Sequence, residues 1–144
     1  MRLTRFSDYA VRVMLYLATH NDRLCSIGEI AAAYDISQNH LMKVVSDLAA
    51  SGYIQSLRGR TGGIRLARPP AEINIGKLIR HTEGQIDLVG CTGCKLEGAC
   101  GLPDPLEQAL EAFFAVLERF SLADVMGHGG GARLLQRFVS SAVA

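Results

Sequence analysis

Three of the four cysteines in this 144-residue chain lie within ten residues of one another, in a stretch rich in glycine. Cys91, Cys94 and Cys100 have a C-x2-C-x5-C spacing, which lets a flexible loop bring three thiolates to one centre. Three thiols cannot all pair as disulfides, so we expect them to bind a metal ion or an iron–sulfur cluster. Both usually take four protein ligands, so the fourth must come from elsewhere. Cys25 lies far upstream, and we interpret it as an ordinary, partly buried thiol.

The composition indicates one domain, or one small domain with a helical arm. Hydrophobic residues make up 49% of the chain, which is enough for a core. No apolar run reaches membrane-spanning length, and the N-terminus lacks the apolar segment of a signal peptide. We therefore expect a cytoplasmic protein with no membrane partner, in a reducing compartment where thiolates persist.

Charge is unevenly distributed along the chain, although the net charge is only +1. Residues 1–82 contain eleven Lys or Arg against six Asp or Glu. Residues 83–144 contain four against eight. A basic first part joined to an acidic second part favours a polyanion-binding module linked to a unit with another task.

Hydrophobic periodicity predicts a helix over residues 5–20. A capping box that begins at Ser26 opens a short helix, which ends near Tyr34. Ser37 is expected to cap a third helix over residues 38–50. Two helices joined by so short a link form a helix-turn-helix.

Residues 53–67 predict a β-hairpin with glycines in its turn, and a hairpin after a helix-turn-helix is a wing. The predicted fold class is therefore mainly α with a small β-hairpin: a winged helix-turn-helix followed by a long helix. The expected divisions are a DNA-binding domain (1–82), a cysteine loop (83–102), a dimerisation helix with a short terminal helix (103–126), and a flexible linker and tail (127–144).

A long helix is expected to begin with Asp104 as its cap and Pro105 at its first position, and to run to Arg119. Two adjacent phenylalanines make its apolar face wider than one neighbouring helix would cover, so we expect a helix from a second copy to pack on it. A core within one chain is the alternative. The expected dimerisation residues are Leu106, Leu110, Phe113, Phe114 and Leu117.

The polar face of the helix at 38–50 carries residue types that can read bases or contact phosphates in a major groove. A glycine-rich wing turn carries arginines that can approach the DNA backbone or minor groove. A merely solvated face is the alternative for the helix, but the arginine wing at the expected offset favours DNA. The candidate DNA-binding residues are Gln38, Asn39, His40, Lys43, Ser46, Arg58, Arg60 and Arg65. The sequence contains no nucleophile elbow or phosphate loop, so we expect no enzyme.

Several segments resemble the winged-helix iron–sulfur transcription regulators, and the resemblance covers residues 1 to about 126. They are residues 1–12, 27–31, 58–66, the three-cysteine loop and residues 112–114. The resemblance implies a homodimer that crosses through the long helix and binds a near-palindromic double-stranded operator.

Residues 6–9 are similar to the nitric-oxide-sensing repressors of that family, in which an Asp from the other subunit completes a four-iron, four-sulfur cluster. The resemblance thus implies Cys91, Cys94, Cys100 and Asp8 of the partner subunit as ligands, with nitric oxide as effector. Asp8 could instead only complement its helix dipole. His81 is the rival ligand, and it would suit a two-iron, two-sulfur cluster. The short spacing between the first two cysteines also leaves a two-iron cluster open.

The favoured function is a cluster-dependent repressor that releases its operator when nitric oxide nitrosylates the cluster. A regulator of the same family that responds to iron or cluster supply is the first alternative. A zinc-stapled structural or interaction module is the alternative from another class. A redox enzyme would need catalytic acid–base residues that the sequence does not display.

Overall fold

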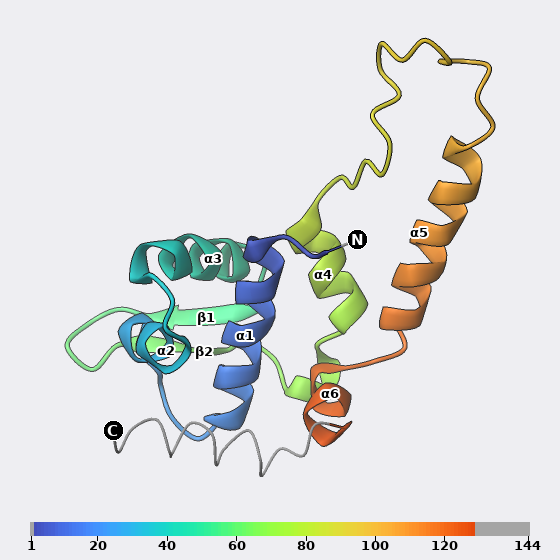
Figure 1. The fold of residues 1–144 in the computed structure, drawn as a ribbon. Helices are drawn as coiled ribbons and strands as arrows, with labels where there is room; N and C mark the ends of the chain where they lie inside the picture. The colour runs from blue at the N-terminus through green and yellow to red at the C-terminus, as the bar shows by residue number, and fades with distance from the viewer. Residues whose placement is uncertain (1, 129–144) are drawn as a thin grey trace.

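The computed structural model describes residues 2–128, and Figure 1 shows their arrangement. β1 and β2 form an antiparallel hairpin among helices, so the predicted fold class is confirmed. The elements are, in order, α1 (Arg5–Thr19), α2 (Ile27–Tyr34), α3 (Gln38–Ala50), β1 (Ile54–Leu57), β2 (Gly63–Leu66), the 3-10 turn η1 (Pro70–Glu72), α4 (Ile75–Glu83), α5 (Pro103–Leu117) and α6 (Leu122–His128).

A short link between α2 and α3 forms the helix-turn-helix. The predicted capping box opens α2: Glu29 N donates to Ser26 Oγ at 3.1 Å, and Ser26 N donates to Glu29 Oε2 at 3.1 Å. Asp35 ends α2 in the left-handed conformation, with a φ of 53°. Asp tolerates that conformation better than most residues, so the chain can turn sharply into α3.

The wing is joined to the rest of the domain by a backbone bridge. Cys25 N donates to the Ile64 carbonyl at 3.0 Å, and Ile64 N donates to the Cys25 carbonyl at 2.8 Å. A Cβ at Gly63 would come within 2.8 Å of the Cys25 carbonyl oxygen, and one at Gly62 would collide with the Leu57 carbonyl. Glycine at position 63 therefore lets the hairpin pack closely against the segment before α2, and glycine at position 62 lets the turn close on itself.

Helix α1 lies in the middle of the fold and contacts α3, α4, α6 and β2 (Figure 1). Its inner side chains Ala10, Val13 and Met14 are fully buried. Ser7 is the only buried polar side chain in residues 2–128, and its hydroxyl pairs with the Thr82 hydroxyl of α4 at 2.8 Å. Burial of α1 between the recognition helix α3 and α4 ties these elements into one core.

One predicted cap lacks its hydrogen bond, and one predicted helix start is wrong, although α3 begins at Gln38 as predicted. Ser37 precedes α3, but its side chain makes no capping hydrogen bond. Helix α5 begins at Pro103 and not after Asp104, with Leu102 at the cap position. The fixed φ of proline suits the first position of a helix, so Pro103 can start the helix two residues earlier than Pro105 would.

Helix α5 lies beside α4 and carries the cysteine loop at its far end (Figure 1). Phe114 is 2% exposed, so this predicted dimerisation residue packs in the core of its own chain. Arg80 of α4 holds α5 in place. Its guanidinium donates to both Glu111 carboxylate oxygens, at 2.9 and 3.0 Å, and lies 4.1 Å from the centre of the Phe114 ring. The same guanidinium lies 3.5 Å from Glu118 Oε1.

Helix α6 includes Gly127 and His128, which the sequence placed in a linker. The remainder of that linker and the predicted tail, residues 129–144, lie outside the described residues. Within residues 2–128, no helix combines the length and the apolar character needed to cross a bilayer.

We expect Gly76→Ala to lower the free energy of unfolding by about 1–3 kcal/mol, as overpacking commonly does. A Cβ at Gly76 would collide with the backbone nitrogen and side chain of Glu118, where the chain leaves α5. Gly28→Ala is the matched control, because its Cβ would meet nothing closer than Gln38 Oε1 at 3.7 Å. That change should be neutral or stabilising, since alanine favours a helix over glycine by about 1 kcal/mol. Equal effects of the two changes in denaturant titrations would contradict the close packing at Gly76.

Candidate metal centre and nucleic-acid interface

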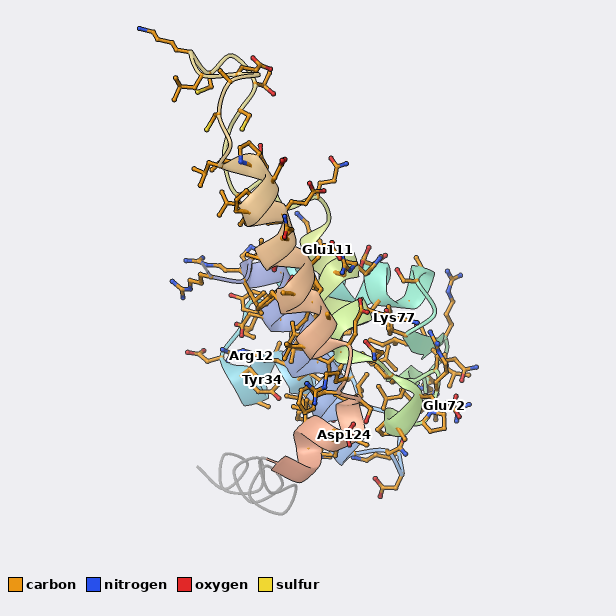
Figure 2. The ribbon with its side chains drawn as sticks, turned by 90° about the vertical axis from the view of Figure 1, so that its right-hand side faces the viewer. Arg12, Tyr34, Glu72, Lys77, Glu111 and Asp124 are labelled. Carbon is orange, nitrogen blue, oxygen red and sulfur yellow. The ribbon has the colours of Figure 1, made fainter. Side chains whose placement is uncertain are left out.

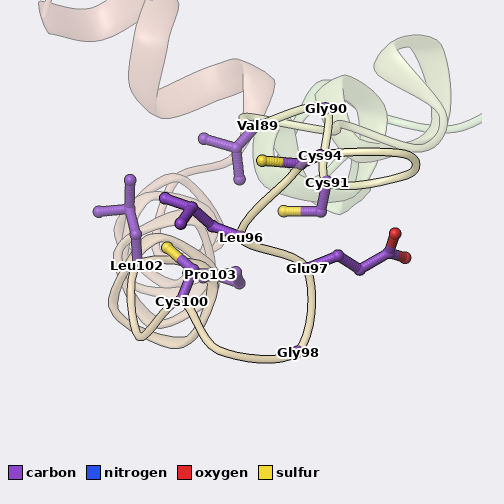
Figure 3. Close-up of a pocket in the computed structure, with 10 residues that line it drawn as sticks. All are labelled: Val89, Gly90, Cys91, Cys94, Leu96, Glu97, Gly98, Cys100, Leu102 and Pro103. Carbon is purple, nitrogen blue, oxygen red and sulfur yellow. The ribbon is translucent and has the colours of Figure 1, made fainter.

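The cysteine loop is a series of turns that brings its three thiols to one pocket. Cys94 N donates to the Cys91 carbonyl at 3.0 Å, and Cys100 N donates to the Leu96 carbonyl at 3.0 Å. All three cysteines line a pocket of about 240 Å³. Figure 3 shows the Cys91 and Cys94 thiols pointing the same way, while Glu97 points away from them.

The three thiols of the pocket surround a shared cavity and do not meet at one point. Within residues 2–128, no three Cys, His, Asp or Glu side chains are gathered tightly enough to hold one metal ion. A four-iron cluster binds each thiolate at its own iron, so three thiols around a shared cavity need not converge on one point. The lining is otherwise mostly apolar, with Leu96 and Leu102 among its residues. An apolar surrounding limits solvent access, which is one way in which proteins tune a cluster.

Asp8, the fourth ligand that the resemblance implies, lies on α1 and not at the pocket of its own chain. Its carboxylate pairs with Arg12 Nε one helical turn later, at 3.0 Å, and both side chains are nearly half exposed. Arg12 also lies beside Tyr34 of α2, with 5.7 Å from the guanidinium carbon to the ring centre (Figure 2). The Asp8 carboxylate is therefore accessible to another molecule.

His81, the rival ligand, is engaged elsewhere. Its Nε2 lies 2.8 Å from Asp47 Oδ2 and 2.8 Å from Ser51 Oγ, both at the end of the recognition helix. It does not line the cysteine pocket.

The last three residues of α4 contact both α1 and α3. His81 contacts α3, as described above, and the Thr82 hydroxyl pairs with the Ser7 hydroxyl of α1. Glu83 Oε1 accepts hydrogen bonds from Thr4 N at 2.8 Å and from Thr4 Oγ1 at 3.0 Å, at the start of α1. The cysteine loop begins directly after this turn. A shift of the loop would therefore act on α1 and α3 together.

The candidate DNA-binding side chains all lie at the surface. Along α3 the exposed candidates are Gln38, Asn39, His40, Lys43 and Ser46. Arg58 and Arg60 are exposed in the wing turn, whereas Arg65 lies on β2 and donates from Nε to Gln55 Oε1 at 2.9 Å. The recognition helix and the wing turn thus present the polar residues expected of a DNA-binding surface.

Cys25 is separate from the other cysteines in both place and chemistry. It is fully buried at the base of the wing, and burial raises the pKa of its thiol to about 11. The thiol is therefore neutral and inert at ordinary pH.

Comparison with known proteins decides the family. A family model described as "Rrf2: Iron-dependent Transcriptional regulator" matches residues 3–128. The chain belongs to the Rrf2 family. It is 46% identical over 132 residues to the "HTH-type transcriptional regulator NsrR" of Bacillus licheniformis, covering 88% of this chain and 92% of that one. A relative of the same name in Geobacillus kaustophilus is also 46% identical and covers 90% of its own length.

The fold of this Rrf2 protein is also that of solved relatives. The structure of IscR from T. potens superposes with a TM-score of 0.72 at 27% identity, covering 92% of this chain and 90% of that one. This Rrf2 chain is therefore a DNA-binding transcriptional regulator and not an enzyme.

Two features of this Rrf2 regulator were missed from its sequence. Arg80 has no local signal, because Glu111 and Phe114 lie more than thirty residues away. Met42 is 50% exposed on the recognition helix, beside residues predicted to face DNA. An exposed apolar residue among the polar ones of that face was the available signal, since apolar side chains can contact thymine methyl groups.

In the cluster-free protein at about pH 8, we expect iodoacetamide to alkylate Cys91, Cys94 and Cys100 but not Cys25. The first three reach the solvent, whereas Cys25 is buried and its raised pKa leaves almost no thiolate. Peptide mass mapping after a timed reaction measures the four sites separately. Denatured protein is the control, in which all four should react. Equally fast labelling of Cys25 in the native protein would contradict its assigned environment.

Proposed function

We propose that this Rrf2 regulator is an iron–sulfur cluster-dependent repressor that releases its operator when nitric oxide nitrosylates the cluster. The observation that carries the proposal is the position of the three-cysteine pocket, directly after a turn that is hydrogen-bonded to α1 and α3. The resemblance of residues 6–9 to the nitric-oxide-sensing repressors supports the choice of nitric oxide over other signals, and the relatives named NsrR are consistent with it.

The working form is a homodimer on a near-palindromic duplex operator. Figure 1 shows the side of α5 that faces away from α4 uncovered within this chain. Leu106, Leu110, Phe113 and Leu117 are only partly buried, although the last three also pack against the core of this chain. Val116 is 51% exposed. Apolar area of this kind on a helix favours a second copy of the same helix. Phe114 supports α5 from inside its own chain.

In the dimer, Cys91, Cys94, Cys100 and Asp8 of the partner subunit hold the cluster. Four irons suit this set, and a two-iron cluster is the alternative. When bound, the cluster supplies iron sites that react with nitric oxide. A carboxylate is a harder ligand than thiolate and binds iron more weakly, so the Asp8 contact is the one most easily broken. The accessible carboxylate of Asp8 supports this role.

The chain itself transmits the change. Release of Asp8 lets its carboxylate pair with Arg12, as it does in this structure. Rearrangement of the cysteine loop pulls on His81, Thr82 and Glu83, whose partners lie on α3 and α1. The recognition helix then moves together with α1. The spacing between the recognition helices of the two protomers changes, and they no longer fit both half-sites of the operator.

The deciding experiment is an anaerobic titration of the cluster-loaded protein with nitric oxide, with the cluster spectrum and retention of an operator duplex followed together. We expect both to be lost over the same range of nitric oxide. If nitric oxide leaves operator binding unchanged but a mild chelator abolishes it, the proposal is overturned in favour of a sensor of iron or cluster supply. A colourless protein that contains zinc and no sulfide would favour the zinc-stapled module.

Asp8→Ala should leave the fold intact and make the cluster labile. The fold should survive because an exposed i,i+4 ion pair contributes little to stability. Loss of cluster absorbance during anaerobic exposure to a weak chelator measures the effect, with thermal unfolding as the fold control. Asp22→Ala, an exposed change at a residue that does not line the cysteine pocket, is the matched variant and should behave as wild type. An unaltered rate of cluster loss in Asp8→Ala would remove Asp8 from the ligand set.

A further inference from the structure

A second pocket of about 240 Å³ lies between the start of α1 and the recognition helix. Its lining combines cationic and aromatic side chains: Arg5, Phe6, Tyr9, His40, Lys43 and Val44. No acidic residue of the described chain lines it. Neither the cysteine pocket nor the wing shares any of these residues.

The position of this pocket decides what can occupy it. Two of its residues, His40 and Lys43, are exposed on the face of α3 that is proposed to enter the major groove. DNA that covers them must therefore also pass over the mouth of the pocket. The opposite wall is the first two turns of α1, which the sequence did not assign to DNA binding.

The chemistry of the lining fits one sugar–phosphate unit of the DNA backbone. Arg5 and Lys43 can pair with the phosphate, since Arg and Lys supply most charged contacts of this kind. The rings of Phe6 and Tyr9 offer an apolar surface to the deoxyribose, and the Tyr9 hydroxyl can donate to a phosphate oxygen. The cationic side chains of the pocket are thus complementary to the phosphate, and its aromatic rings are complementary to the largely apolar deoxyribose ring.

We infer that this pocket seats a backbone sugar–phosphate of each operator half-site, so that α1 is itself part of the DNA interface, with Arg5 as its phosphate ligand. The inference rests on the proposed repressor function and extends it. Asp8 lies in the same turn of α1 as Arg5 and Tyr9. Helix α1, which provides Asp8 as a ligand to the partner's cluster, therefore also binds the DNA backbone. Movement of α1 would displace the pocket from the sugar–phosphate, together with any shift of α3.

The test compares three alanine variants of the cluster-loaded protein on one labelled duplex, selected from a random-sequence library by the wild-type protein. Each phosphate contact contributes about 0.9 to the slope of log affinity against log salt. Arg5→Ala should therefore flatten the slope by about one per bound protomer. Arg60→Ala, in the wing, should do the same. Arg119→Ala is the matched charge control, because that exposed arginine lies at the end of α5, and its slope should be unchanged.

A chemical change in the DNA locates the contact independently. A neutral methylphosphonate is placed singly at each backbone position of the selected duplex. At one position per half-site it should weaken the wild-type complex but leave the Arg5→Ala complex no weaker than before. If no position behaves in this way, or if Arg5→Ala keeps the wild-type slope while Arg60→Ala loses it, the inference is overturned and the repressor function stands. If the loaded protein selects no duplex at all, the proposed function fails and the inference fails with it.

Discussion

Helix α1 cannot move independently of α3 and α4, because its inner face is fully buried between them. The buried Ser7 hydroxyl of α1 pairs with the Thr82 hydroxyl of α4 at 2.8 Å and also accepts a hydrogen bond from Thr4 Oγ1 at 3.2 Å. Breaking the hydrogen bond between the two helices would cost about 0.5–1.5 kcal/mol, in addition to the buried apolar contacts that already couple them. This packing makes α1 the element through which a rearrangement of α4 would reach α3.

The two ends of α5 differ in how firmly they are attached to the rest of the chain. The base of α5 is held by Arg80, which donates a forked pair of hydrogen bonds to Glu111 and covers the Phe114 ring. The cysteine loop at the other end of α5 makes mostly local hydrogen bonds within its own turns. A loop built in this way can rearrange around a cofactor while the helices that flank it keep their places.

Local features of the fold could be predicted from the sequence, and distant pairings could not. The capping box at Ser26 and the apolar stripe of α1 depend on residues within one or two turns, and both were predicted correctly. The cap at Ser37 failed because a suitable residue type does not ensure the side-chain geometry. His81 was expected near the metal centre as a rival ligand. Its actual partners, Asp47 and Ser51, lie about thirty residues away, and only the three-dimensional packing of α4 on α3 brings them within reach.

In the wing turn, the residues that determine the backbone path differ from those that carry the charge. Gly62 and Gly63 fix the path of the hairpin, since any larger residue there would strike a backbone carbonyl. Arg58 and Arg60 beside them are exposed and carry no part of that packing. Substitution at the arginines should therefore change the charge of the wing with little penalty in folding, while the glycines stay in place. If the wing contacts the DNA backbone as proposed, a lineage of such regulators could raise or lower its affinity for all of its operators together by drift at two surface positions.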